Sequence, residues 1–405
     1  MIGGGAIGAT TAYELAKSGQ SVTLLEREPE VGLGCSAGTV GLLAPSHAGT
    51  LATPKALRDG IVWMTKRESP FYIRPRPQIV SWLLRFAWAA LDRRQVARST
   101  ELLRTLSLDG LRLHVELANA VPTGLEQRGT LYVYESQAGF EHALELIPSN
   151  TERGLTVRAL DPAAARKLEP AVGDGIAGAV YCKEEAHLDS LRYVQAITRA
   201  AEEAGAEIRT RAEVLNFDIA DGRIAAIETT AGRFQAGTVV LAAGVWSREL
   251  GRRLGLSIPL EGAKGYHIEW ERRDEDPHIP VYMHESRVIA TPYADRLRIA
   301  GMLELTGLDG SIDQVRLKAL EKAARRNLRV TGEPKVVSVW RGLRPTPPDG
   351  MPLLGRPRSV NNLVVATGHA MTGVALAPVT ARLVRELVNG EAPSYDLTLL
   401  DPDRF

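Results

Sequence analysis

Three glycines near the start of the 405-residue chain have the spacing of a phosphate-binding loop. In the pattern G-x-G-x-x-G, Gly3 permits a tight turn, Gly5 lets the backbone approach a pyrophosphate, and Gly8 allows close packing of a helix on a strand. The next run, ATTAYELAKSG, predicts a helix, whose N-terminus offers free N–H groups and a positive dipole end to phosphates. The strand SVTLLE then ends at Glu26, which is 18 residues after Gly8 and well placed to bind ribose hydroxyls. The sequence therefore predicts a dinucleotide site.

The stretch that follows, VGLGCSAGTVGLLAPSH at residues 31–47, is rich in glycine and small side chains and has no helical period. Such a segment leaves room for a bulky ligand to pass close to the backbone. A nicotinamide enzyme would instead continue with repeating strand and helix units. The segment therefore favours FAD over NAD as the dinucleotide.

With these two motifs, the chain resembles the superfamily of FAD-dependent D-amino acid oxidases and dehydrogenases, which includes glycine oxidase and sarcosine oxidase. Four later stretches carry the same resemblance, namely residues 187–214, TVVLAAGVWS at 238–247, WRGLRPTPPDGMPLLG at 340–355 and LVVATGHAMTGVALAP at 363–378. The resemblance implies an α/β flavoprotein of the glutathione-reductase type. A Rossmann-type FAD-binding domain would be joined to a substrate domain with a mixed, largely antiparallel sheet.

The resemblance also implies which residues contact the flavin nucleotide. They are Gly3, Gly5, Ala6, Ile7, Gly8, Glu26, Arg27, Cys35, Ser36, Ala37, Gly41, Leu42, Val214, Ala243, Gly244, Trp246, Gly342, Gly368, His369, Met371, Thr372 and Gly373. Most of these contacts are expected through the backbone.

A second helix is predicted by VALAPVTARLVRELVNG, which is amphipathic and ends before Gly390. Its N-terminus would lie at the flavin and stabilise the negative charge of the reduced ring by about 0.3 to 2 kcal/mol. His369, just before this helix, has the pKa range of a catalytic base, but the resemblance favours a backbone role. The cysteine that binds flavin covalently in sarcosine oxidases has no counterpart, because no cysteine follows Cys182. Dissociable, non-covalent FAD is therefore predicted, and no metal site.

Arg344, in the motif GLRP, lies at the position that binds the substrate carboxylate in glycine oxidase and D-amino acid oxidase. The planar guanidinium matches the two oxygens of a carboxylate, with a structural ion pair as the alternative role. The strand GYHIEW places Tyr266 and His267 on opposite faces. Tyr266 is predicted to reach the substrate carboxylate, and His267 to be scaffold.

Four further residues are predicted around the substrate. His47, His284 and Arg287 are candidates for the pocket wall, and the alternative for each is an ordinary surface position. Met371 stands where glycine oxidase has an arginine, which indicates a more apolar site. A hydrophobic side chain, or a ring such as that of proline, would then be preferred over glycine.

The resemblance implies the oxidation of an amino acid, most simply a D-amino acid, by hydride transfer from the α-carbon to flavin N5. The imine would hydrolyse to a 2-oxo acid and ammonia, and dioxygen or a quinone would reoxidise the flavin. An enzyme for glycine or a secondary amine such as sarcosine, proline or hydroxyproline is the nearest alternative. A flavoprotein of RNA modification and a non-catalytic flavin-binding subunit are alternatives of another class. Lys and Arg (49) balance Asp and Glu (48), which argues against a nucleic-acid partner.

Both domains are predicted to be discontinuous. Residues 1–60, 154–258 and 338–405 would bind FAD, while residues 61–153 and 259–337 would form the substrate domain.

The run IVSWLLRFAWAAL at residues 79–91 is shorter than the ~20 residues that span a bilayer, and Arg85 interrupts it. With Trp82 and Trp88 it could rest in a membrane interface; a helix that covers the substrate domain is the alternative. With two cysteines and no signal peptide ahead of the glycine loop, the predicted location is the cytoplasm. Peripheral contact with the inner face of the membrane is the added possibility.

Overall fold

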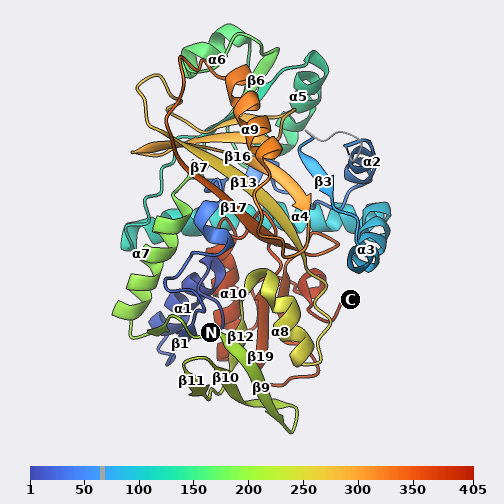
Figure 1. Ribbon diagram of the computed structural model, residues 1–405, viewed down its shortest axis with the longest axis vertical. Coiled ribbons are helices and arrows are strands. Elements are labelled where there is room, and N and C mark those ends of the chain that lie inside the picture. The colour runs from blue at the N-terminus through green and yellow to red at the C-terminus, as the bar shows by residue number, and fades with distance from the viewer. Residues whose placement is uncertain (64–68) are drawn as a thin grey trace.

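The computed structural model describes residues 1–63 and 69–405. Two halves are stacked along the long axis, and both termini lie in the lower half (Figure 1). The lower half is built on parallel strands with helices packed against them, and the upper half on one large, mostly antiparallel sheet. This arrangement confirms the predicted fold class.

The lower half contains the nucleotide-binding strands. Ile2 bridges in parallel to β1 (Thr23–Leu25) on one side and to β12 (Val239–Leu241) on the other. The layer extends from β1 to β8 (Glu207–Arg209) and from β12 through β19 (Leu363–Thr367) to β18 (Leu353–Gly355). Helix α1 (Ala6–Lys17) packs against α7 (Ser190–Glu203) and α10 (Ala377–Asn389) through small and aliphatic side chains. The fold thus places the N-terminus of α1 beside the ends of the parallel strands.

Three smaller elements complete this half. A three-stranded antiparallel sheet contains β9 (Val214–Ala220), β10 (Arg223–Thr229) and β11 (Gly232–Phe234). The short helix η4 (Gly244–Trp246) leads into α8 (Ser247–Arg253), and β2 (Leu42–Leu43) pairs with β7 (Ala186–His187).

The upper half is a nine-stranded sheet. Its main path is β17 (Val336–Thr346), β13 (Glu261–Glu271), β16 (Arg296–Leu305), β15 (Val288–Pro292), β14 (Val281–Met283), β4 (Thr130–Tyr134), β6 (Gly178–Cys182) and β5 (Val157–Leu160), and β3 (Phe71–Ile73) pairs with β16. Helices α9 (Gln314–Asn327), α5 (Gln137–Glu152) and α6 (Pro162–Leu168) pack on it. Because two strand pairs are parallel and the others antiparallel, the sheet is mixed.

Strand pairing favours other domain boundaries than those predicted from the sequence. Strands β5 and β6 extend the large sheet through β4, so the crossing expected near residue 154 lies close to residue 185 instead. The crossing expected near 338 falls inside β17, which pairs along its whole length with β13. The crossing near 258 agrees with the start of β13, whereas the one near 60 falls inside α2 (Pro54–Trp63). We propose residues 71–185 and 261–346 as the substrate half.

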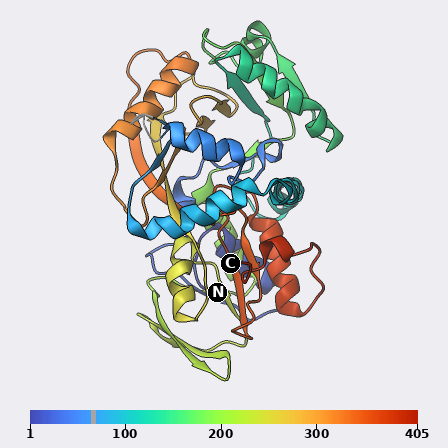
Figure 2. The same cartoon turned by 90° about the vertical axis from the view of Figure 1, so that its right-hand side faces the viewer.

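Helices α2, α3 (Val80–Leu91) and α4 (Arg93–Ala120) lie where the two halves meet, and Figure 2 views the side that carries α2 and α3. Helix α4 begins at Asp92, whose carboxylate accepts hydrogen bonds from the backbone N–H groups of Arg94 and Gln95. It then packs against α10. A Cβ on Gly110 would lie 2.4 Å from the carbonyl oxygen of Ala375, so the helix contacts the chain just before α10 directly.

Candidate cofactor and substrate site

A cavity of about 700 Å³ runs from the glycine loop to the large sheet. Most predicted cofactor contacts line it, namely Gly3, Gly5, Ala6, Ile7, Glu26, Arg27, Cys35, Ser36, Leu42, Val214, Ala243, Gly244, Trp246, Gly368, His369, Met371, Thr372 and Gly373. Four predicted substrate residues, His47, Arg287, Arg344 and Met371, line the same cavity. The structure thus brings segments from the whole length of the chain to one site.

The glycine loop is held by close packing. Gly3 has a φ of +104°, which favours glycine, and a Cβ on Gly8 would lie 1.8 Å from the carbonyl oxygen of Gly3. Gly8 does not line the cavity, because its role is the contact between helix α1 and the loop. At the start of α1, the backbone N–H of Ala6 donates to Ser36 Oγ at 3.0 Å. The small-residue segment is therefore fastened to the helix N-terminus.

Glu26 lies at the end of β1 with its carboxylate fixed. Its Oε2 accepts from the Gly4 N–H at 2.6 Å, and its Oε1 accepts from the Glu28 N–H at 2.9 Å. The carboxylate keeps further lone pairs for ribose hydroxyls. Nearby, the Arg27 guanidinium lies 3.7 Å from the centre of the Trp246 ring, a cation–π contact in the wall at this end of the cavity.

Three other predicted contacts, besides Gly8, do not line the cavity: Ala37, Gly41 and Gly342. A Cβ on Gly41 would lie 1.8 Å from the Leu188 carbonyl oxygen, and one on Gly342 would lie 2.0 Å from the Trp340 ring. These two glycines are required for packing of the chain around the cavity. Ala37 lies in the short helix η1 (Cys35–Gly38), between residues that do line it.

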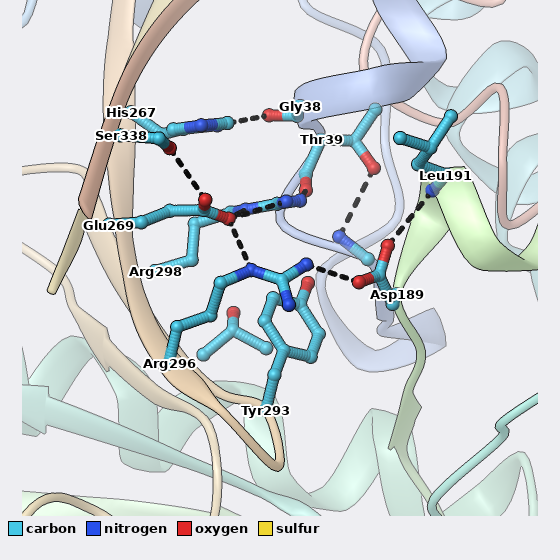
Figure 3. Close-up of polar contacts among 12 residues, drawn as sticks. Gly38, Thr39, Asp189, Leu191, His267, Glu269, Tyr293, Arg296, Arg298 and Ser338 are labelled. Carbon is cyan, nitrogen blue, oxygen red and sulfur yellow. Dashed lines mark hydrogen bonds and ion pairs between the residues drawn. The ribbon is translucent and has the colours of Figure 1, made fainter. Parts of the chain in front are cut away.

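Residues 38–40 are clamped to the large sheet by a buried ionic network (Figure 3). Arg298 Nη1 donates to the Thr39 carbonyl oxygen at 2.5 Å, and His267 Nδ1 contacts the Gly38 carbonyl oxygen at 3.2 Å. His267 is therefore scaffold, as predicted. Because Thr39 and Val40 line the cavity, the network fixes part of the cavity wall.

Glu269 is the centre of this network. It accepts hydrogen bonds from Arg296 at 2.7 Å, Arg298 at 2.9 Å and Ser338 at 2.6 Å. Arg296 also pairs with Asp189, the N-cap of α7, and so connects the two halves. Burial would raise the pKa of Glu269, but Arg298 and the hydrogen bonds from Ser338 and Arg296 lower it to about 2.

At the C-terminal side of the cavity, the wall is formed by residues 366–375, from the end of β19 to the loop before α10. His369 is 3% exposed, and its Nε2 lies 2.9 Å from Thr380 Oγ1 inside α10. Burial lowers the pKa of His369 to about 3, so the ring is neutral near pH 7. This placement supports a backbone contact rather than a role as a base.

Arg344 reaches from β17 across the neighbouring strand. Its Nη1 donates to the Met302 carbonyl oxygen at 2.9 Å, and a Cβ on Gly265 would lie 2.3 Å from both terminal nitrogens. Burial lowers the pKa of Arg344, while nearby Cys35 raises it. No carboxylate among the described residues forms an ion pair with this guanidinium, so the structural ion pair considered above is not seen there.

Backbone geometry explains this position of Arg344. The pairing of β13 with β16 shifts between Lys264 and Tyr266, and Met302, opposite the shift, has a φ of +66°. Such a bulge re-aims groups beside a functional site, and here a carbonyl accepts from the guanidinium. The sequence analysis missed Gly265 and Met302; a glycine inside a strand was a signal for the first, and none marked the second.

The prediction for Tyr266 is corrected by the structure. Its side chain is 1% exposed, it does not line the cavity, and its hydroxyl donates to Glu304 Oε2 at 2.5 Å. Burial and the bond to Glu304 raise its pKa. Because side chains alternate along β13, Tyr266 faces the core under α9, and Gly265 and His267 face the other way.

His47 lies in the cavity wall, stacked on Tyr132 with ring centres 3.8 Å apart. Its Nδ1 lies 3.1 Å from Ser46 Oγ, and that hydroxyl donates to the fully buried Glu185 at 2.5 Å. Tyr132 donates to the other Glu185 oxygen at 2.6 Å. Burial lowers the pKa of His47 to about 3, with His284, Arg287 and Arg104 acting in the same direction. Glu185, which the sequence analysis missed, therefore anchors a neutral imidazole in the wall.

The remaining predicted substrate residues divide between the cavity and its surroundings. Arg287 lines the cavity, and its Nη1 lies 3.4 Å from the Tyr282 hydroxyl. His284 does not line it; its ring packs 4.8 Å from Tyr134, and burial and Arg287 lower its pKa to about 4. Met371 lines the cavity and is 56% exposed.

The cavity fits a flavin nucleotide. Added Cβ atoms on Gly34 and Gly244 would meet no other atom within 4 Å, so glycine backbone faces open space there. The start of α1 supplies a positive dipole end and Glu26 a fixed acceptor at the same end of the cavity. The N–H groups at the start of α1, the Glu26 carboxylate and the exposed glycine backbone together define a dinucleotide-binding site of the flavoprotein type.

Known proteins agree with this class. The model of the FAD-dependent oxidoreductase family (DAO) matches residues 1–387, and the chain belongs to that family. It is therefore an FAD-dependent enzyme. A protein named D-amino acid dehydrogenase from Paramagnetospirillum magneticum is 32% identical over 100% of this chain and 98% of its own length.

Solved structures share the fold. Glycine oxidase from Geobacillus kaustophilus has a TM-score of 0.80 and 24% identity, covering 100% of this chain and 97% of its own. L-proline dehydrogenase from P. horikoshii has a TM-score of 0.76 and 20% identity. The match covers 100% of this chain and 96% of that protein's chain.

Proposed function

We propose that the protein oxidises D-amino acids with FAD. The observation that carries this proposal is Arg344, a guanidinium in the cavity wall that no carboxylate among the described residues neutralises. A free α-carboxylate is its natural partner, since the planar fork binds two oxygens at once. The D configuration is supported by the relatives named D-amino acid dehydrogenase.

FAD supplies the acceptor for a hydride from the substrate α-carbon. The protein positions the substrate. Arg344 binds its carboxylate, and the Met302 carbonyl and the close approach to Gly265 hold Arg344 in place. Such positioning accounts for much of the catalysis in reactions of this kind. The imine that leaves the site hydrolyses to a 2-oxo acid and ammonia.

Reduction of the flavin under anaerobic conditions tests this function. A panel of D-amino acids is expected to bleach the flavin absorbance, with the matching L-amino acids, glycine, sarcosine and L-proline as comparisons. Faster bleaching by L-proline or sarcosine would favour the secondary-amine alternative. Loss of all bleaching with bound FAD would indicate a non-catalytic subunit. Reoxidation with dioxygen or a quinone then identifies the electron acceptor.

We also propose that FAD is bound without a covalent bond. Cys182 lies buried in β6 outside the cavity, and Cys35 is the cysteine that lines it. Acid denaturation followed by centrifugation is expected to leave the flavin colour in the supernatant. Colour in the protein pellet would show a covalent bond.

Helix α3 offers an apolar face for a membrane surface. Val80, Leu84, Trp88 and Leu91 follow one face of the helix and are 52%, 68%, 81% and 65% exposed. Trp82 instead points inward and donates to the Thr346 carbonyl oxygen at 3.0 Å. No described helix is both long and apolar enough to cross a bilayer.

Exposed Arg85, Arg93 and Arg94 accompany this apolar face. We therefore propose that a cytoplasmic enzyme touches the anionic inner face of the membrane through α3. Co-sedimentation with vesicles that contain phosphatidylglycerol is expected, and Leu84→Ser with Trp88→Ser should abolish it. The control is Leu215→Ser with Ile219→Ser, two exposed apolar residues on β9. Equal pelleting of all variants would contradict the proposal.

A further inference from the structure

The substrate end of the cavity contains cations beyond Arg344. Arg287 and Lys55 both line it, and neither forms an ion pair with a carboxylate in the described part of the chain. Two acids lie in this part of the chain: Asp59, which also lines the cavity, pairs with Arg58 at 3.6 Å, and Glu285 accepts from two backbone N–H groups. This end of the cavity therefore has an excess of positive charge that one substrate carboxylate would not neutralise.

Sheet register places Arg287 close to the group that holds Arg344. The carbonyl oxygen of Arg287 would lie 2.7 Å from a Cβ on Gly301, and Val288 pairs with Gly301. The next residue, Met302, accepts the hydrogen bond from Arg344. Because neighbouring strands lie about 4.8 Å apart, the backbone of Arg287 is one strand away from that carbonyl.

Arg287 is held in a specific conformation. Its φ is +53°, a left-handed backbone that is uncommon for arginine. Its N–H donates to the His284 carbonyl oxygen at 3.3 Å, and its Nη1 contacts the Tyr282 hydroxyl. Residues in such conformations concentrate at ligand-binding sites, where the surrounding structure imposes them.

The neighbours of Arg287 are suited to an anion. His47 lines the cavity, and burial, His284 and Arg287 lower its pKa, so that its ring is neutral near pH 7 and able to donate an N–H. Ile289 and Leu303 line the cavity beside these polar groups and offer contact to methylene groups.

We propose that Arg287, with Lys55 beside it, binds a second carboxylate, so that the preferred substrates are acidic D-amino acids such as D-glutamate. This rests on the proposed function, and it replaces the preference for a hydrophobic side chain that Met371 led us to expect. The α-carboxylate pairs with Arg344, the methylene groups lie on the apolar wall, and the distal carboxylate pairs with Arg287.

D-glutamate and D-glutamine differ at the distal group only, so they isolate this contact. The unmodified enzyme is expected to favour D-glutamate in kcat/KM by at least about tenfold, because a charge-assisted bond is lost with the amide. Arg287→Asn should remove that preference by lowering kcat/KM for D-glutamate at least about tenfold, with a smaller change for D-glutamine. Asparagine adopts left-handed backbone readily, so the variant keeps its fold. Arg199→Gln, which removes an exposed cation of α7 outside the cavity, is the matched control.

Binding of glutarate provides a readout that needs no turnover. Calorimetry of the holoenzyme is expected to show glutarate binding at least about tenfold more tightly than pentanoate, with the difference lost in Arg287→Asn. Equal affinities, or equal effects of Arg287→Asn on D-glutamate and D-glutamine, would overturn the inference. If glutarate binds in an Arg287-dependent way and no D-amino acid reduces the flavin, the diacid site stands and the proposed function fails.

Discussion

The two ends of the cavity are built in different ways. At the nucleotide end, the glycine loop, the N-terminus of α1 and the Glu26 carboxylate all lie within the first 26 residues. At the substrate end, Arg344, Arg287 and His47 come from three separate segments and are placed by strand register and buried hydrogen bonds. A local motif therefore specifies one end, and the tertiary structure specifies the other.

This difference predicts different consequences of substitution. Changes at the nucleotide end should remove FAD and leave substrate affinity in the remaining holoenzyme unchanged. Changes at the substrate end should raise KM and leave the FAD content unchanged.

The largest effect is expected for Arg344→Ala. Loss of a buried, charge-assisted contact should raise KM for the amino acid by about 100-fold or more. Steady-state kinetics measures KM, and the absorbance ratio of flavin to protein measures FAD content, which should not change. Arg344→Lys should recover part of the affinity, because it keeps the charge without the planar fork. A KM within about threefold of the original would contradict the assigned role.

The next largest effect is expected for Gly8→Ala, at the other end of the cavity. The added methyl group would lie 1.8 Å from the Gly3 carbonyl oxygen, so α1 must move away from the loop. Overpacking costs about 1–3 kcal/mol, which corresponds to about 5- to 150-fold weaker FAD binding if the whole cost falls on the FAD-bound state. Titration of the apoprotein with FAD gives the affinity. Gly237→Ala, where an added Cβ meets nothing within 4 Å, should bind FAD normally.

Glu269→Gln tests the buried ionic network that connects the two halves of the molecule. Breaking a buried ion pair costs about 3–5 kcal/mol, so urea unfolding near pH 7 should show a clear loss of stability. The folded pKa of Glu269 is lowered to about 2 from an ordinary value of 4.5. Its contribution is therefore complete above about pH 4.5 and is lost as the pH falls toward 2. The difference between the two proteins should shrink in that window; a constant difference would show that the charge of Glu269 is not the cause.

The smallest effect on substrate binding is expected for Tyr266→Phe. This change removes the hydroxyl bonded to Glu304 in the core, so it should lower stability by about 1–3 kcal/mol and alter KM by less than about twofold. Gly265→Ala, one residue away on the opposite face, should raise KM by about tenfold, because its methyl group displaces the Arg344 guanidinium. An equal rise in KM for both variants would contradict the assignment of the two faces.

Most residues predicted for the nucleotide end line the cavity, and they could be chosen from the sequence because each acts through its own backbone or through a short spacing. Gly3, Gly5 and Glu26 needed no knowledge of distant partners. The sequence did not reveal which face of β13 meets the cavity, since alternation defines two faces and only the packing of α9 selects one. The same limit explains the displaced domain boundary near residue 154, because the pairing of β5 and β6 with β4 is a long-range property.

Helix α4 directly precedes β4 of the large sheet in the sequence, yet it packs against the loop before α10 in the lower half. His114 Nε2 lies 2.9 Å from the Val374 carbonyl oxygen, and Gly110 lies against Ala375. Both loop residues line the cavity. A substitution in α4 can thus shift the wall beside the cofactor from a distance. Substitutions in α4 therefore offer a way to alter the surroundings of the cofactor while the glycine loop and Arg344 stay intact.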